Sequence, residues 1–356
     1  MRRLPLVRSL AGMDSVRESP VLQTAPLGLH WPTVDPFLFC AHHDDAYPAG
    51  DDHLAPAVAL GERDMGQDFS GRDGFSMYHG MVVPGFPNHP HRGFETVTFV
   101  RKGLIDHSDS LGATARFGRG DVQWLTAGKG IVHAEMFPLV KADEPNPLEL
   151  FQIWLNLPAA DKLVDPYFTM FWSEDIPMVV TTDDAGRTTT VTVIAGQFGE
   201  VDPHAPPPNS WAARAEADVA IWHLHLEAGA SWELPPAAGG AEVGRVLYVF
   251  EGDTMQVAEV EVANDTAVAV LADVAVRLVA GSEPVEILLL QGRPIGEPVA
   301  QYGPFVMNTE AEIRQAFADY QATEFGGWPW PDDAPTHGRD RGRFALHVDG
   351  RLEQAP

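Results

Sequence analysis

Short apolar segments, separated by glycine and proline, run through the whole chain. Glycine and proline contribute 33 and 30 of the 356 residues. Between them lie runs of β-branched and aromatic residues, for example Glu95–Val100, Leu150–Leu155, Thr190–Ile194 and Val246–Phe250. Such residues favour strands, and glycine and proline end them. The sequence therefore predicts an all-β protein built from many short strands, as in sandwiches and barrels.

The predicted strands fall into two blocks of similar size, residues 37–157 and residues 178–290. The segment between them, residues 158–177, is polar and punctuated by proline, which is typical of a linker. Two β blocks of similar size suggest a duplicated barrel. We expect an N-terminal barrel over residues 25–165, a second barrel over 178–308, and a terminal helix and tail over 309–356.

The helix prediction rests on the start of this last segment. Thr309 and Glu312 have the spacing of a capping box, and Ile313, Phe317 and Tyr320 follow on one helical face. The tail after Gly327 is rich in proline, aspartate and arginine, so we expect an extended segment with a short strand over residues 344–348. We also expect the barrels to stay folded when this tail is deleted.

Charge and cysteine content exclude several classes of function. Lysine and arginine total 24 and aspartate and glutamate total 50, a formal net charge of −26. A chain this acidic repels phosphate backbones, so we expect no direct nucleic-acid binding. No apolar run approaches the roughly 18 residues of a membrane span. The single cysteine, Cys40, excludes an internal disulfide and a cysteine-based zinc site, and we expect a cytoplasmic protein.

Two pairs of metal-ligand residue types stand about forty residues apart. His89 and His91 are separated by one residue, and so are His133 and Glu135. Residues i and i+2 of a strand face the same side, so each pair converges on one point. Two paired strands would then bring three imidazoles and a carboxylate together. This donor set suits Fe(II), and also Mn, Ni, Cu or Zn.

Two other histidine clusters are weaker candidates. His223 and His225 also form a His-x-His pair, but no His-x-Glu pair accompanies it, so we interpret both as polar residues on the solvent side of a strand. The cluster at residues 42–45, His-His-Asp-Asp, has neighbours that point apart on an extended chain. We interpret it as a loop near a barrel mouth.

Longer motifs around the first candidate site resemble the pirin family of the cupin superfamily. They are His-Pro-His-Arg-Gly-Phe-Glu-Thr-Val-Thr at residues 89–98 and Gly-Asp-Val-Gln-Trp-Leu-Thr-Ala-Gly-Lys-Gly-Ile-Val-His-Ala-Glu-Met at residues 120–136. Segments 34–39 and 297–309 also agree. The resemblance implies two tandem cupin β-barrels (a bicupin) with one metal, most often iron, in the N-terminal barrel.

Carried over by residue, the resemblance places the metal ligands at His89, His91, His133 and Glu135. It leaves the second barrel without ligands. Glu95, which stands where other cupins carry their ligand glutamate, is expected beside the site, where it would orient an imidazole or take a proton.

The resemblance implies two functions of different classes. The first is a dioxygenase like quercetin 2,3-dioxygenase, which cleaves a flavonol with O2. Glu135 or Glu95 would then be the general base, and Phe86, Phe94, Trp124 and Met136 would line the chamber. The second is a redox- and metal-dependent regulatory protein that binds transcription or metabolic partners.

Overall fold

The computed structural model describes residues 19–356, and their regular secondary structure is mostly β-strand. Two compact units divide the chain. The first barrel comprises residues 42–153, 157–175 and 297–356, and the second comprises the described residues up to 41 together with 154–156 and 176–296. The all-β prediction with two barrels is confirmed.

The ends of the units differ from the boundaries expected at 25–165, 178–308 and 309–356. Strand β1 (Val21–Pro26) pairs with β18 (Thr266–Val270), so this early segment belongs to the second barrel. Residues 297–356 group with the first barrel instead of forming a separate part. Both differences arise from pairing between segments far apart in the chain.

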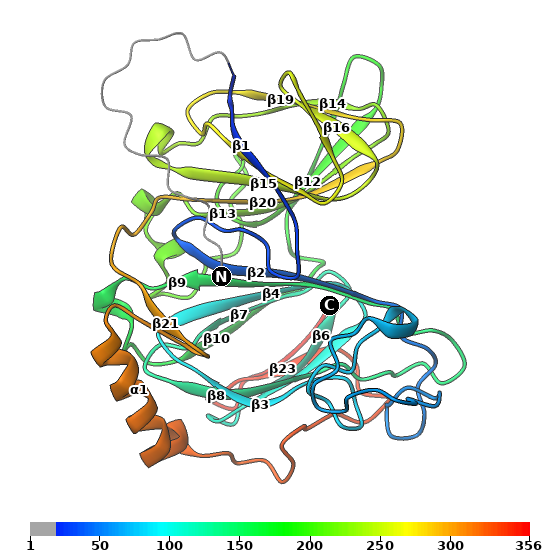
Figure 1. Ribbon diagram of the computed structural model, residues 1–356, viewed down its shortest axis with the longest axis vertical. Coiled ribbons are helices and arrows are strands. Elements are labelled where there is room, and N and C mark those ends of the chain that lie inside the picture. The colour runs from blue at the N-terminus through cyan, green and yellow to red at the C-terminus, as the bar shows by residue number, and fades with distance from the viewer. Residues whose placement is uncertain (1–18) are drawn as a thin grey trace. The chain divides into compact units, whose positions relative to one another are not determined.

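Two sheets form the first barrel (Figure 1). The five-stranded sheet has the order β10 (Tyr167–Phe171), β7 (Val122–Thr126), β4 (Phe94–Lys102), β9 (Leu148–Asn156), β2 (Phe37–Asp45). The six-stranded sheet has the order β24 (Leu352–Gln354), β23 (Phe344–Leu346), β6 (Thr114–Gly118), β5 (Leu104–Asp109), β8 (Ile131–Met136), β3 (Gly85–His91). Inward side chains such as Val100, Ile105 and Leu125 belong to one buried cluster between the sheets.

The second barrel has an apolar interior. Its seven-stranded sheet has the order β1, β18, β15 (Gly244–Glu251), β20 (Val285–Gly292), β13 (Ala220–Leu226), β12 (Thr188–Ala195), β11 (Met178–Thr182). Its four-stranded sheet has the order β14 (Ser231–Leu234), β19 (Val276–Ala280), β16 (Thr254–Val257), β17 (Val260–Ala263). Leucine, valine, tryptophan and methionine side chains from both sheets fill the space between them.

Residues 19–356 contain one α-helix, α1 (Glu310–Thr323), which follows the hairpin β21 (Ala300–Tyr302) and β22 (Phe305–Met307). Thr309 caps it and Glu312 completes the predicted capping box. Ile313 and Phe317 pack on Phe305 of β22. Short 3₁₀ turns occupy Arg72–Gly74, Ala159–Asp161, Trp211–Ala213, Ala215–Ala217, Gly240–Glu242 and Glu324–Gly326.

The C-terminal tail is an ordered part of the first barrel. Strand β23 pairs with β6, and β24 pairs with β23, so the tail adds two strands to the six-stranded sheet. In Figure 1 the red strand β23 lies beside β6. The predicted short strand is therefore present, and it belongs to the barrel.

No helix in residues 19–356 is both long enough and apolar enough to cross a membrane.

Candidate metal centre

Strands β3 and β8 bring the two predicted ligand pairs side by side. The strands are antiparallel, with His89 opposite His133 and Phe86 opposite Glu135. The register shifts between Phe86 and His89, which marks a β-bulge with one extra residue in β3. Because facing residues of an antiparallel pair project from the same side, the histidines of both strands meet.

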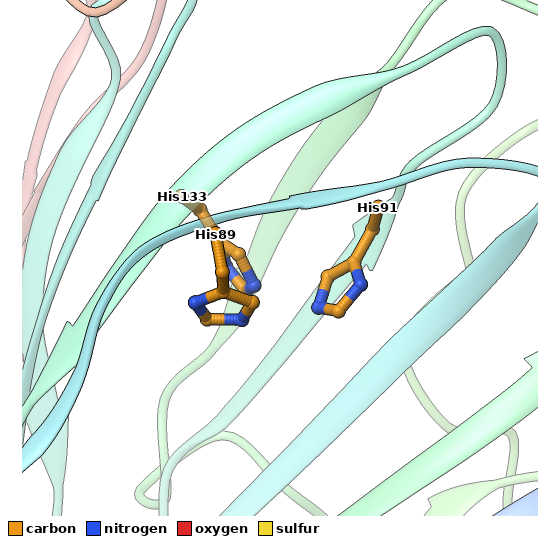
Figure 2. A group of neighbouring side chains, drawn as sticks. All are labelled: His89, His91 and His133. Atoms are coloured by element: carbon orange, nitrogen blue, oxygen red, sulfur yellow. The ribbon is translucent and has the colours of Figure 1, made fainter. Parts of the chain in front are cut away.

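Three imidazoles form a compact cluster. One ring nitrogen from each of His89, His91 and His133 lies within 4.8 Å of the others. The ring centroids are 4.4 Å apart for His89 and His133, and 4.9 Å apart for His91 and His133. Figure 2 shows the three rings on the same side of the two neighbouring strands. Within residues 19–356 no second group of three or more such side chains is gathered in this way.

Burial favours the neutral form of the three histidines, which is the form that binds a metal. Burial lowers the pKa of His89 to about 4, and it holds the pKa values of His91 and His133 well below the usual range. The Nδ1 atom of His89 lies 2.9 Å from the carbonyl oxygen of Pro87, which accepts its proton and leaves Nε2 as the lone-pair atom. Neither ring nitrogen of His133 has a hydrogen-bond partner, although both are buried. Such polar atoms are costly to bury, and a coordinated cation would satisfy one of the two.

Glu135 supplies a carboxylate next to the cluster. Its Oε2 is 4.0 Å from Nε2 of His133. Thr98 of β4 donates to Oε1 at 3.2 Å, and Gln152 of β9 donates to Oε2 at 2.9 Å. Burial raises the pKa of Glu135, and a bound cation would instead favour its charged form. The residues present thus fit a divalent metal ion held by three nitrogens and one oxygen.

Comparison with known proteins identifies the family of this chain. Residues 19–155 match the pirin family and residues 221–326 match the pirin C-terminal cupin domain. The chain belongs to the pirin family. A Pseudomonas aeruginosa protein named "Putative quercetin 2,3-dioxygenase PA2418" is 39% identical over 68% of this chain and 79% of its own length. A pirin-like protein of Caulobacter vibrioides is 38% identical over 68% of this chain and 80% of its own.

Solved structures give the same result for the fold. A quercetin 2,3-dioxygenase crystal structure from Acinetobacter baumannii superposes with a TM-score of 0.67 and 25% identity, covering 86% of this chain and 98% of that one. The two barrels of this pirin are therefore of the cupin type, as the sequence motifs indicated.

Glu95, expected beside the site, faces the other way in this pirin. Thr98 and Val100 point into the barrel, and Glu95 stands an odd number of residues before each of them on β4. Its carboxylate accepts a hydrogen bond from Thr126, its partner on β7, at 2.6 Å. This orientation argues against a role for Glu95 in orienting an imidazole or taking a proton in the chamber.

The predicted apolar lining is half right. The ring of Phe86 lies 6.3 Å from that of His89, and the ring of Phe94 lies 5.1 Å from that of His91. Trp124 pairs with Val97 on the outward face of β4 and β7, and Met136 alternates with Glu135 on β8. Trp124 and Met136 therefore belong to the outer faces of the strands, because the expectation took sequence proximity for a shared face.

Three side chains near the site were not predicted: Thr98, Gln152 and His107. His107 of β5 faces Glu135 across the strand pair, and its ring lies 5.4 Å from that of His133. Its Nε2 is 3.3 Å from Oδ2 of Asp109. The His-x-Asp spacing of residues 107 and 109 is the signal that could have found it.

The two weaker histidine clusters do not join a metal site. Residues 42–45 end strand β2 instead of forming a loop, and the hydroxyl of Tyr78 links His43 to Asp45, at 2.8 and 2.7 Å. In the second barrel His223 is buried, and its Nε2 lies 2.5 Å from Glu286. The interpretation of His223 as a solvent-facing residue is wrong, because Glu286 and the ring of Phe250 lie against its imidazole.

Proposed function

We propose that this pirin is a mononuclear metal-dependent dioxygenase that cleaves quercetin-type flavonols with O2. The observation that supports this proposal is the group of three converging imidazoles, His91 and His133 buried and His89 half-buried, with the carboxylate of Glu135 beside them. The names of its relatives point to the same activity. We propose Fe(II) as the metal, since nitrogen and carboxylate ligands with open positions suit it.

A divalent cation bound by His89, His91, His133 and Glu135 would accept the flavonol hydroxyl oxygen and lower the pKa of that hydroxyl. The side chains around the site carry out the remaining proton transfer. The carboxylate of Glu135 lies 4.0 Å from Nε2 of His133, so it is our candidate to accept the hydroxyl proton. Thr98 and Gln152 donate to its two oxygens and hold the carboxylate in place.

Aromatic side chains beside the site are suited to a flat substrate. Phe86 lies between His89 and the rings of Tyr78 and Phe137. Its ring is 5.1 Å from that of Tyr78 and 6.0 Å from that of Phe137. Phe94 adds a second ring next to His91. These rings would exclude water from the reacting atoms and hold the flavonol by stacking and apolar contact.

The proposal is tested by metal analysis and an aerobic quercetin assay on the same sample. We expect about one metal ion per chain and oxygen uptake that depends on quercetin and rises with metal content. Full metal occupancy without quercetin-dependent oxygen uptake would rule out the proposed activity while leaving the metal site intact.

A pair of substitutions separates the two carboxylates. Glu135→Gln replaces a charged oxygen donor with a neutral amide, so we expect weaker metal binding and loss of turnover. Glu95→Gln removes the same charge from the outward face of β4, so we expect the metal to be retained. We also expect turnover within about tenfold of wild type, which is a smaller loss than removal of a general base usually causes. Metal content and oxygen uptake are measured for both.

Two other outcomes would change the roles assigned to these carboxylates. If Glu95→Gln empties the site and Glu135→Gln does not, the ligand assignment drawn from the pirin motif is incorrect. If Glu95→Gln keeps the metal but lowers turnover by 10²-fold or more, Glu95 takes part in the reaction despite its orientation.

A further inference from the structure

The segment that joins α1 to β23 crosses the sheet that carries the histidines. We call residues 328–337 the strap. The matched pirin domains end at residue 326, so the strap lies beyond them. It runs from the 3₁₀ turn Glu324–Gly326 to the loop before β23, and its hydrogen bonds reach strands β3 and β5.

The first contact of the strap is with the β-bulge of β3. Strand β3 is at the edge of its sheet, next to β8. On its other side residues 77–79 bond to Gly85, at the start of the strand and before the bulge. At the bulge, the amide of Asn88 donates to the carbonyl oxygen of Asp333 at 2.8 Å, and its side-chain Nδ2 donates to Oδ1 of Asp333 at 3.1 Å. Asn88 lies between His89 and Pro87, whose carbonyl orients the imidazole of His89.

The second contact of the strap is with β5, the strand that pairs with β8 at His133. Trp330 donates through its indole nitrogen to the carbonyl oxygen of Asp109 at 2.8 Å. Asp109 faces His133 across the β5–β8 pair, and its carboxylate contacts His107. Ala334 packs in a small apolar cluster with Met136, which follows Glu135 on β8. The strap therefore contacts three adjacent strands of the site.

We propose that the strap is a positioning element for the metal site, and that Asp333 acts by holding the bulge that presents His89. An edge strand with a bulge has few bonds to define its path, and a bulge sets the direction of the side chains that follow it. The two bonds from Asn88 to Asp333 supply what a second neighbouring strand would otherwise provide. This inference rests on the metal site of the proposed function and not on the flavonol reaction.

The test uses Co²⁺ as the probe, because its visible absorption reports the geometry of its ligands. In full-length Asp333→Ala and Asn88→Ala we expect Co²⁺ affinity to fall by about tenfold, the lower end of the effect of residues that orient metal ligands. We also expect a changed Co²⁺ spectrum. In Trp330→Ala/Asp333→Ala, which loses both side-chain contacts, the fall is expected to be larger.

Two variants serve as controls. Asp333→Asn keeps an oxygen acceptor for Asn88, so we expect Co²⁺ affinity and spectrum close to wild type. Asp340→Ala removes the same charge from an exposed position of the tail and is expected to leave both unchanged. Hydrogen exchange of the metal-free protein provides a second measurement, and we expect faster exchange in β3 for Asp333→Ala but not for Asp340→Ala.

Unchanged Co²⁺ affinity, spectrum and β3 exchange in Asp333→Ala would overturn the inference. So would an equal loss of affinity in Asp340→Ala or no rescue in Asp333→Asn, because either result would indicate a general effect of charge or stability. A wild-type protein that binds Co²⁺ but does not consume O2 with quercetin would count against the proposed reaction alone.

Discussion

Replacing His133 with alanine is expected to abolish stoichiometric metal binding. His133 faces His89 across the β3–β8 pair, and both of its ring nitrogens are buried without a hydrogen-bond partner. Its loss removes one of three converging imidazoles. We expect affinity to fall by more than about 100-fold, beyond the effect of losing an orienting residue. Metal content after exhaustive dialysis measures the result.

The matched control is His223→Ala in the second barrel. His223 is also a buried histidine of a His-x-His pair, and it contacts Glu286. We expect lower stability of the second barrel but unchanged metal content per folded chain. Equal metal loss in both variants would contradict the assignment of the site to the first barrel, and unchanged metal in His133→Ala would contradict the ligand set.

Deleting residues 328–356 is expected to destabilise the first barrel strongly, contrary to the expectation drawn from the sequence. Arg116 is fully buried and forms a two-bond pair with Asp106. The same guanidinium donates to the carbonyl oxygens of His337, Gly338 and Arg341, all in the tail. Deletion removes these three acceptors and leaves the edge of β6 unpaired.

The expected size of this loss follows from the contacts. Hydrogen bonds to a charged group contribute about 1.5–3 kcal/mol each, and burial of Phe344 contributes a further 2 kcal/mol or so. At about 2–4 °C per kcal/mol for a domain of this size, the melting temperature should fall by more than 10 °C. A full-length variant, Asp340→Ala, is the control. A truncated protein that melts within about 3 °C of wild type would contradict the structural role of the tail.

The sequence was sufficient for the parts of this molecule that depend on local pattern. Strand-forming runs between glycines and prolines predicted the all-β class, and the capping box at Thr309 predicted the start of α1. The four proposed ligands could be selected because each pair lies within one strand, where alternation sets the facing side. His89, His91, His133 and Glu135 all lie on β3 and β8.

Prediction failed where a turn or a distant pairing decides the outcome. Counting from His91 to Glu95 crosses Gly93, whose φ of 83° is not an extended conformation and which lies between β3 and β4, so alternation does not carry across it. Likewise β1 joins a sheet with β18, and β23 joins β6, over separations that no local pattern encodes. Thr98 and Gln152 reach Glu135 from two other strands, and only the closed barrel brings them there.

The tail that adds β23 and β24 beyond β6 also contacts the opposite border of the same sheet, at Asn88 of β3. The exposed edge strands of a sheet are templates on which other chains can pair, and proteins protect them with short strands, charges or covering segments. Here a single stretch of chain protects both borders. Proteolysis within residues 328–343 would therefore expose two pairing edges at once, and self-association would compete with refolding.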